Sequence, residues 1–300
     1  MIRISQVETI CPEICLLGEC PNWNVGQQKL HWTDIKRYCL WNYDYIKKTS
    51  EIFWKGSHQV GGFAFTKKDD IVLCTDKGVF ILEKKRGYAN PPRRLFEISL
   101  KKEEMFNDII VDPIGRIIAG TLDRKNYNGS LYKLEKEKEP VLLMDGIQCS
   151  NGMAFSMDNQ YFYHTDSKKY SITKFKYDVS TGDISHPIPF YQVDKSQGLP
   201  DGMTIDIEGY IWSAFWGSHT VRRFSPVGKM VHEVTFPAKQ VTSVTFGGRD
   251  MDKIFVTSAC QGADDPASGY NKDGTFLGGP TYMYTPGRNI RGRPEWLADF

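Results

Sequence analysis

Several features are absent from this sequence of 300 residues, and each absence narrows its function. No run of about 18 apolar residues occurs, so a transmembrane helix is not expected. The segment Met1–Val7 alternates like a β-strand and lacks the basic and apolar regions of a secretory signal. Lys and Arg total 38 against 36 Asp and Glu, a balance that gives no sign of nucleic-acid binding. We therefore expect neither a nucleic-acid nor a membrane partner.

Cysteine pairing is also missing. The seven cysteines are an odd number and show no paired spacing typical of a zinc site. A reduced intracellular protein is the simplest interpretation, and we expect a cytoplasmic location. Cys149 lies two residues before Asn151 and could be a nucleophile. A buried, inert thiol is the better interpretation, because no histidine shares its place in the chain.

No segment of helical length shows the 3.6-residue spacing of an amphipathic helix. Turn residues recur instead at intervals of 42, 46, 44, 50 and 41 residues, at Asn24, Thr66, Asp112, Ser156, Asp206 and Gly247. A period in this range is typical of β-propellers and helical solenoids. The lack of helical spacing favours the propeller.

One repeat shows the expected unit clearly. Between residues 201 and 236, short turns separate four β-prone segments at 202–205, 210–215, 220–224 and 231–236. Six such units predict an all-β, six-bladed propeller of four-stranded antiparallel blades, forming a single domain over residues 1–300. The N-terminal strand and the segment near residues 281–284 are expected to share one blade. Ring closure protects the sheet edges, so we expect a monomer or weak oligomer.

One position of the repeat holds the candidate functional residues. Five residues before each turn stand Glu19, Gly61, Asn107, Asn151, Asp201 and Thr242. The first strand of each propeller blade lines the central channel, so these positions should meet at one mouth. Four of them offer carboxylate or amide oxygens and none is His or Cys, which favours a hard divalent cation. Asn and Asp before Gly are also common turn residues, but four in one register favour a metal site.

The segments around these positions resemble the senescence-marker-protein/gluconolactonase/luciferin-regenerating-enzyme family. The resemblance runs from about residue 14 to residue 260. The matching segments are more similar to the prokaryotic sugar-lactonase branch than to the animal regucalcin branch. The most specific matches are L-G-E-C-P-N-W (17–23), F-N-D-I-I-V-D-P-I-G-R (106–116), S-N-G-M-A-F-S-M-D (150–158) and P-D-G-M-T-I-D-I-E-G (200–209).

The resemblance implies a metal-dependent hydrolase that opens a sugar-derived lactone, such as glucono-, xylono- or arabinono-lactone. It implies one divalent ion, which could be Ca, Mg, Mn, Zn or Fe, held by Glu19, Asn151 and Asp201. It also implies that Asp201 is catalytic, accepting a proton from the attacking water, and that Asn107 contacts the substrate. The expected partner is therefore a small-molecule lactone.

One departure from the family affects the substrate site. Many members carry Arg immediately before the F-N-D motif, where this chain has Met105. The loss of that cation should change how sugar hydroxyls are held. Arg124 or Lys125 could supply a replacement, so Met105 and Arg124 stand as substrate-binding candidates beside Asn107.

Three other functions stay open at this point. The chain could be a hydrolase of phosphotriesters or other esters on the same scaffold. It could be a calcium-binding regulatory protein, which would bind metal without turnover. It could also be a propeller that serves as an interaction platform, in which case replacing Asp201 with Ala would leave function unchanged.

Overall fold

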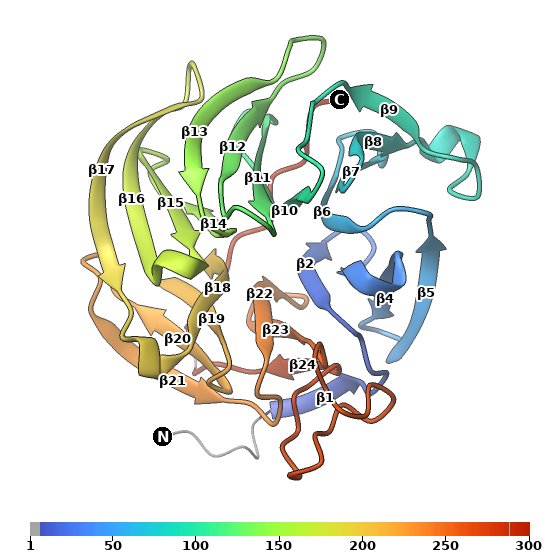
Figure 1. Cartoon of the computed structure of the whole chain (residues 1–300), viewed down its shortest axis with the longest axis vertical. Coiled ribbons are helices and arrows are strands. Elements are labelled where there is room, and N and C mark those ends of the chain that lie inside the picture. Colours follow the sequence, from blue (N-terminus) through green and yellow to red (C-terminus); the bar gives the residue numbers. More distant parts are fainter. Residues whose placement is uncertain (1–6, 288) are drawn as a thin grey trace.

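The computed structural model describes residues 7–287 and 289–300, so the alternating segment at residues 1–6 lies outside the described part. Six four-stranded antiparallel sheets surround a central axis (Figure 1). The prediction of an all-β, six-bladed propeller is therefore confirmed. Helical structure in the described residues is limited to short 3₁₀ turns. None of them has the length or apolar character needed to cross a membrane.

Five blades are built from four strands consecutive in the chain, with the first strand nearest the axis (Figure 1). Blade 1 contains β2 (Gly18–Asn24), β3 (Lys29–Asp34), β4 (Cys39–Asp44) and β5 (Thr49–Lys55). Blade 2 contains β6 (Val60–Phe65), β7 (Ile71–Thr75), β8 (Gly78–Leu82) and β9 (Arg93–Phe96). Blade 3 contains β10 (Glu104–Val111), β11 (Ile117–Asp123), β12 (Gly129–Leu134) and β13 (Val141–Ile147).

Blades 4 and 5 follow the same plan. Blade 4 contains β14 (Ser150–Phe155), β15 (Tyr161–Asp166), β16 (Ser171–Asp178) and β17 (Asp183–Gln192). Blade 5 contains β18 (Leu199–Ile205), β19 (Ile211–Trp216), β20 (Thr220–Phe224) and β21 (Met230–Thr235). The 3₁₀ turns are η2 (Ile35–Arg37), η3 (Lys84–Arg86), η4 (Ser167–Lys169) and η5 (Lys195–Gln197).

Blade 6 combines distant parts of the chain. Its inner strands are β22 (Val241–Gly247) and β23 (Lys253–Ser258), followed by β24 (Thr281–Tyr284) and β1 (Val7–Cys11). β1 pairs antiparallel with β24, with Val7 opposite Tyr284. The two ends of the chain share this blade as predicted, but through a strand at Val7–Cys11, and residues 1–6 of the segment expected to form it lie outside the described part. This pairing closes the ring.

Apolar side chains fill the spaces between neighbouring sheets. Trp32 and Trp212 are fully buried, as expected for large aromatic side chains that pack between blades. Trp216 is half-buried at the end of β19. Each buried cluster joins residues of two adjacent blades, for example Trp212 of blade 5 with Phe246 of blade 6. The core is therefore a series of interfaces arranged around the axis.

Near the axis, glycines allow neighbouring inner strands to approach closely. A Cβ atom on Gly61 would lie 2.0 Å from the carbonyl oxygen of Phe106, and one on Gly152 would lie 2.4 Å from that of Asp201. No larger residue fits at either place without backbone movement. These glycines bring β6 against β10 and β14 against β18, which sets the spacing of side chains around the channel.

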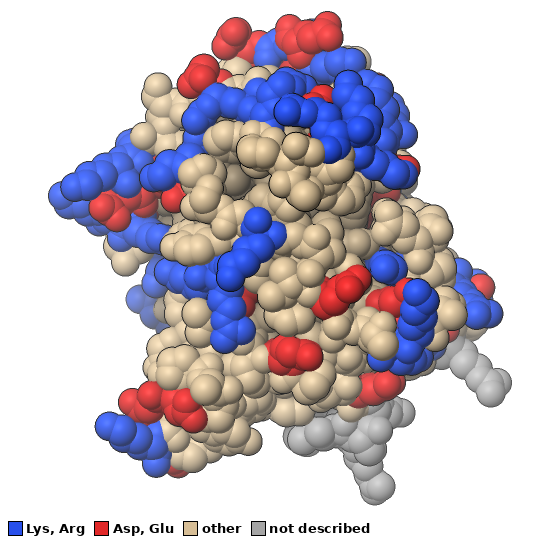
Figure 2. Space-filling view, turned by 90° about the vertical axis from the view of Figure 1, so that its right-hand side faces the viewer, with Lys and Arg blue, Asp and Glu red and all other residues tan. Residues whose placement is uncertain are grey.

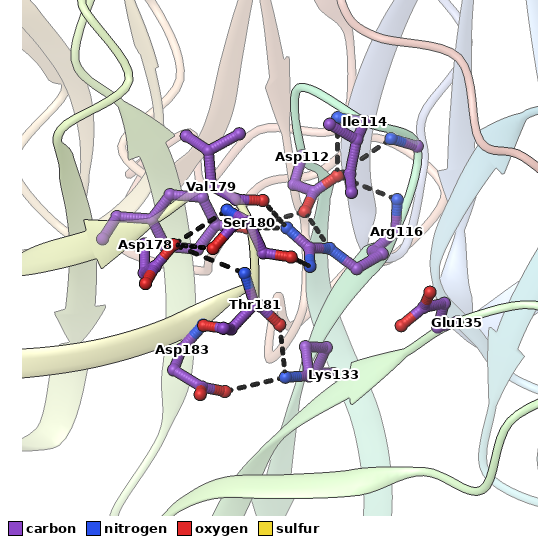
Figure 3. Close-up of polar contacts among 12 residues, drawn as sticks. Asp112, Ile114, Arg116, Lys133, Glu135, Asp178, Val179, Ser180, Thr181 and Asp183 are labelled. Atoms are coloured by element: carbon purple, nitrogen blue, oxygen red, sulfur yellow. Dashed lines mark hydrogen bonds and ion pairs between the residues drawn. The ribbon is translucent and has the colours of Figure 1, made fainter.

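A buried polar network joins blade 3 to blade 4 (Figure 3). One Asp112 carboxylate oxygen accepts hydrogen bonds from the backbone N–H groups of Ile114, Gly115 and Arg116, each 2.9 Å long. The other accepts from the Arg116 guanidinium and from the Tyr177 hydroxyl. Arg116 also donates to the carbonyl oxygen of Val179 at 2.6 Å, which ties a turn of blade 3 to the β16–β17 turn.

A C-terminal segment crosses the face of the propeller that carries these turns. The Ile207 N–H donates to the Arg291 carbonyl oxygen, and the Gly292 N–H donates to that of Met251. Farther along, the Ala298 N–H donates to the Phe65 carbonyl oxygen, and the Asp299 N–H to that of Gly115. This strap, residues 291–299, therefore links blades 6, 5, 3 and 2 across one end of the channel.

Replacing Arg116 with Met should destabilise the protein by about 3 kcal/mol or more, because it leaves the buried Asp112 carboxylate without its cation. Both side chains are at most 4% exposed. Urea unfolding followed by fluorescence measures the change. Lys138→Met is the matched control, because the Lys138–Glu135 pair is largely exposed and should contribute less than about 1 kcal/mol. Equal effects of the two substitutions would contradict a stabilising role for the network.

Candidate metal centre

The repeated polar position falls at an irregularity of the inner strand in every blade. The pairing of first and second strands shifts register between Glu19 and Asn22, between Asn151 and Met153, and between Pro200 and Met203. The other three blades shift at the same place. A β-bulge bends a strand and redirects its side chains. The inner strands begin one to three residues before these positions, because strand pairing continues on the outer side of each bulge.

Blades 1, 4 and 5 supply the predicted metal ligands. Glu19, Asn151 and Asp201 are 8%, 6% and 4% exposed. Burial raises the pKa of Glu19 well above its usual range, and the neighbouring Asp201 carboxylate raises it further. Burial also raises the pKa of Asp201, while a hydrogen bond from Asn151 acts in the opposite direction. The structure thus brings all three side chains together in a site of concentrated negative charge.

Within residues 7–287 and 289–300, two oxygen atoms in this group find no hydrogen-bond partner. The Asn151 side-chain amide donates to the Ser167 hydroxyl at 3.1 Å, and Ser167 donates to the Pro200 carbonyl oxygen at 2.6 Å. This chain fixes the amide orientation and leaves Asn151 Oδ1 without a partner. Asp201 Oδ1 is likewise buried and unpartnered. Buried polar atoms are normally paired, so two free acceptor oxygens beside Glu19 fit a hard divalent cation.

Carboxylates alone do not complete the site. Across residues 7–287 and 289–300, no three His, Cys, Asp or Glu side chains are arranged to hold a metal ion. An ion held by Glu19 and Asp201 would therefore need the Asn151 oxygen as a third ligand. Three protein ligands would leave coordination positions for water and for a substrate oxygen.

Asn107 lies at the adjoining inner strand of blade 3. Its side-chain amide donates to the Ser150 carbonyl oxygen at 2.8 Å, which places it beside the strand that carries Asn151. The Ser150 hydroxyl lies 2.8 Å from His164 Nε2. Burial lowers the pKa of His164 to about 4, so this histidine is neutral at pH 7 and helps to hold Ser150.

Asp108 is a residue of this site that the sequence reasoning missed. It lines a small cavity on the axis together with Cys20 and Glu295, a residue of the strap. Burial raises the pKa of Asp108 to about 7, and its charge raises the pKa values of Glu19 and Asp201. Strand alternation would turn Asp108 away from Asn107, but the register shift between Phe106 and Ile109 removes that alternation. The sequence feature that could have identified Asp108 is its carboxylate, which comes directly after the repeated position.

Arg124, one of the two residues considered as a replacement for the family arginine, contacts Met105. Met105 is 2% exposed, and Arg124 Nη2 lies 2.8 Å from its sulfur atom. The same nitrogen donates to Gln59 Oε1 at 3.0 Å. Arg124 therefore reaches from the end of β11 over the start of β10 toward blade 2.

The thiols have the character of inert core residues. All seven cysteines are free. Burial raises the pKa of Cys149 to about 12, and the nearby Asp201 carboxylate adds to this shift. A neutral thiol is a poor nucleophile, so the structure agrees with the interpretation of Cys149 as unreactive.

A six-bladed propeller with a buried oxygen-ligand cluster at one channel mouth defines the class of protein. The sequence model of the SMP-30/Gluconolactonase/LRE-like region matches residues 17–260. The chain belongs to this family.

Individual relatives support the assignment. Pentonolactonase XacC of Haloferax volcanii is 30% identical over 285 residues, covering 95% of each chain. A solved luciferin-regenerating enzyme is 28% identical with a TM-score of 0.88, covering 98% of this chain and 99% of the other. A calcium-binding protein, regucalcin, from Agrobacterium tumefaciens is 26% identical with a TM-score of 0.88, covering 97% of each chain.

Glu19→Gln should stabilise the metal-free protein at pH 8. The folded state holds the Glu19 proton more tightly than the unfolded chain does, so stability falls as pH rises from about 4 through the raised pKa. Removing the charge should raise the melting temperature in EDTA by at least about 2–4 °C, the shift that 1 kcal/mol produces in somewhat smaller chains. Thermal scans at pH 5 and pH 8 measure this.

The matched control for that substitution is Glu139→Gln, because Glu139 is an exposed residue outside the cluster. It should leave the melting temperature unchanged at both pH values. A lower melting temperature of Glu19→Gln in EDTA at pH 8 would show that the buried charge does not destabilise the metal-free fold.

Proposed function

We propose that this protein is a metal-dependent hydrolase that opens the ring of a sugar-derived lactone, an aldonolactone such as glucono-, xylono- or arabinono-lactone, to the aldonic acid. The observation that carries this proposal is the buried set of Glu19, Asn151 and Asp201 with two unpartnered oxygens. The similarity to a protein named pentonolactonase supports the lactone as substrate class.

Glu19, Asn151 and Asp201 would hold the divalent ion. When bound, such an ion supplies a Lewis acid that polarises a carbonyl group and stabilises negative charge on its oxygen. The fixed amide of Asn151 keeps its oxygen turned toward the site through the hydrogen bond to Ser167. Ligand orientation therefore needs no rearrangement on binding.

Asp201 has the properties of a general base. Burial raises the pKa of its carboxylate, and this makes the ionised form a stronger proton acceptor than an exposed aspartate. It would take a proton from the water whose oxygen attacks the lactone carbonyl carbon. The ring C–O bond then breaks, and the released ring oxygen takes up a proton to become a hydroxyl.

Substrate positioning would fall to the residues of blade 3. Asn107 is anchored through its amide nitrogen, which leaves its side-chain oxygen available to accept a hydrogen bond from a sugar hydroxyl. Met105 stands where many family members have arginine, but it is 2% exposed and would act on the substrate through Arg124, which contacts its sulfur atom. These groups would orient the lactone ring without taking part in proton transfer.

A calcium-binding protein without turnover is the second candidate. The similarity to the Agrobacterium protein described as calcium-binding favours it. The same three side chains would bind the ion in both cases. Metal binding alone therefore cannot distinguish the two functions, and turnover must be measured.

The test is a pH-indicator hydrolysis assay on metal-stripped protein, with five- and six-membered aldonolactones, simple esters and phosphotriesters as substrates. We expect turnover of aldonolactones that returns when a divalent metal is added. Asp201→Ala should lower kcat by at least about 100-fold, because it removes both a ligand and the proton acceptor.

Asp145→Ala is the matched control, because Asp145 is exposed on β13, the outermost strand of its blade. It should retain full activity. Tight metal binding by calorimetry without hydrolysis of any lactone would reject the lactonase and favour the binding protein. Turnover confined to phosphotriesters or simple esters would reject the substrate class but keep the hydrolase.

A further inference from the structure

Cations gather on the side of the mouth formed by blades 1 to 4. In each of blades 1 to 4, the loop between the second and third strands carries Lys or Arg. They are Lys36 and Arg37, Lys77, Arg124 and Lys125, and Lys168 and Lys169. Asp76 is the single acidic residue in these four loops. The loops lie at the mouth because each second strand ends opposite the start of its inner strand, as Asp34 lies opposite Gly18.

Some of these cations are neutralised by acids nearby. Arg37, Lys77 and Lys169 lie 3.8, 3.6 and 3.2 Å from Asp34, Asp76 and Asp166. In the part of the chain that the structure describes, Lys36 and Arg124 make no such ion pair. On the outer side drawn in Figure 2, by contrast, acidic side chains lie among and beside the gathered basic ones.

Hydrogen bonds place Arg124 near the loop that carries Lys36. Arg124 donates to Gln59, and the next residue, Val60, accepts a hydrogen bond from the Thr33 hydroxyl, three residues before Lys36. Contacts with Gln59 and Met105 hold the Arg124 guanidinium in place. Lys36 is half-buried, and its pKa is lowered first by burial and then by the charge of Arg124. Two like charges held together without an acid are unfavourable, and an anion placed between them would relieve the repulsion.

We propose that Lys36 and Arg124 bind an anionic group, a phosphate ester or a second carboxylate, that the lactone substrate carries at a distance from its reacting carbonyl. This inference rests on the proposed lactonase function and specifies its substrate class. A guanidinium suits both groups, because it can donate two parallel hydrogen bonds to a phosphate or carboxylate.

The charge distribution also fixes the direction in which such a substrate enters. Glu19, Asp108 and Asp201 lie on inner strands, whereas Lys36 and Arg124 lie on loops that follow the second strands at the rim of the mouth. The anionic group would stay at the rim with Lys36 and Arg124, while the neutral lactone ring enters toward the cluster. A lactone without a charged substituent gives neither cation a partner.

The experiment compares kcat/KM of the full chain for glucono-lactone, its 6-phosphate and glucaro-lactone, with metal present. The wild type should prefer one or both anionic substrates. Arg124→Gln and Lys36→Gln should each lower kcat/KM for the preferred anionic substrate by about tenfold, the effect of losing a charge-assisted hydrogen bond. For neutral glucono-lactone the loss should stay below about twofold. The phosphate and carboxylate arms identify which anion is recognised.

Lys229→Gln is the matched control, because Lys229 is exposed in the β20–β21 turn at the opposite end of its blade. It should leave all three values unchanged. Equal losses on neutral and anionic substrates in Arg124→Gln would overturn the inference and assign Arg124 to sugar hydroxyls. Turnover of glucono-lactone with no preference for either anionic substrate would also overturn it, while leaving the lactonase function in place.

Binding gives a readout that does not depend on turnover. Calorimetry with the open-chain acids gluconate, 6-phosphogluconate and glucarate should show tighter binding of one of the two acids that carry a second anionic group. That preference should be lost in Arg124→Gln. If no lactone is hydrolysed, the proposed function fails, and this binding result alone decides the inference: equal affinities for all three acids reject it.

Discussion

Closure of the ring is the constraint on which the rest of the structure depends. The inner strands approach so closely that Gly61 and Gly152 leave no room for a Cβ atom. The pairing of β1 with β24 completes the circle and leaves no inner strand without two neighbours. Each inner strand is held between two neighbouring inner strands, so its position is fixed. The side chains at the bulges therefore meet at the mouth in a single arrangement. The candidate site is a product of this geometry.

The buried like charges at that mouth lower the stability of the metal-free protein, but they form the proposed metal site. Burial raises the pKa values of Glu19, Asp108 and Asp201, and no basic group in the described part of the chain lowers them. Elsewhere in the molecule a buried carboxylate is fully compensated, as Asp112 is by Arg116, Tyr177 and backbone N–H groups. The contrast supports the proposal of a functional site at the mouth, because structural carboxylates are satisfied within the fold.

Much of this could be read from the sequence, and the limits have physical causes. Repeat spacing gave the six blades and placed Glu19, Asn151 and Asp201 at one mouth, because a circular repeat makes equivalent positions meet. Asp108 escaped notice because strand alternation fails at a bulge, which one sequence does not reveal. Lys36 and Arg124 come from loops of blades 1 and 3, and no spacing along the chain encodes how side chains of separate loops lie relative to one another.

The mixed composition of blade 6 has a consequence for the order of folding. Blades 1 to 5 are each continuous in sequence and can form from local contacts, whereas blade 6 needs both β1 and β24. Glu19 follows the seam directly, Asn151 comes from blade 4 across the ring, and Asp201 comes from blade 5, next to blade 6. Long-range pairing of this kind is slow because loop-closure entropy must be overcome first. A cation that binds all three side chains would therefore bind only completed rings and would stabilise the folded state at a late step of folding.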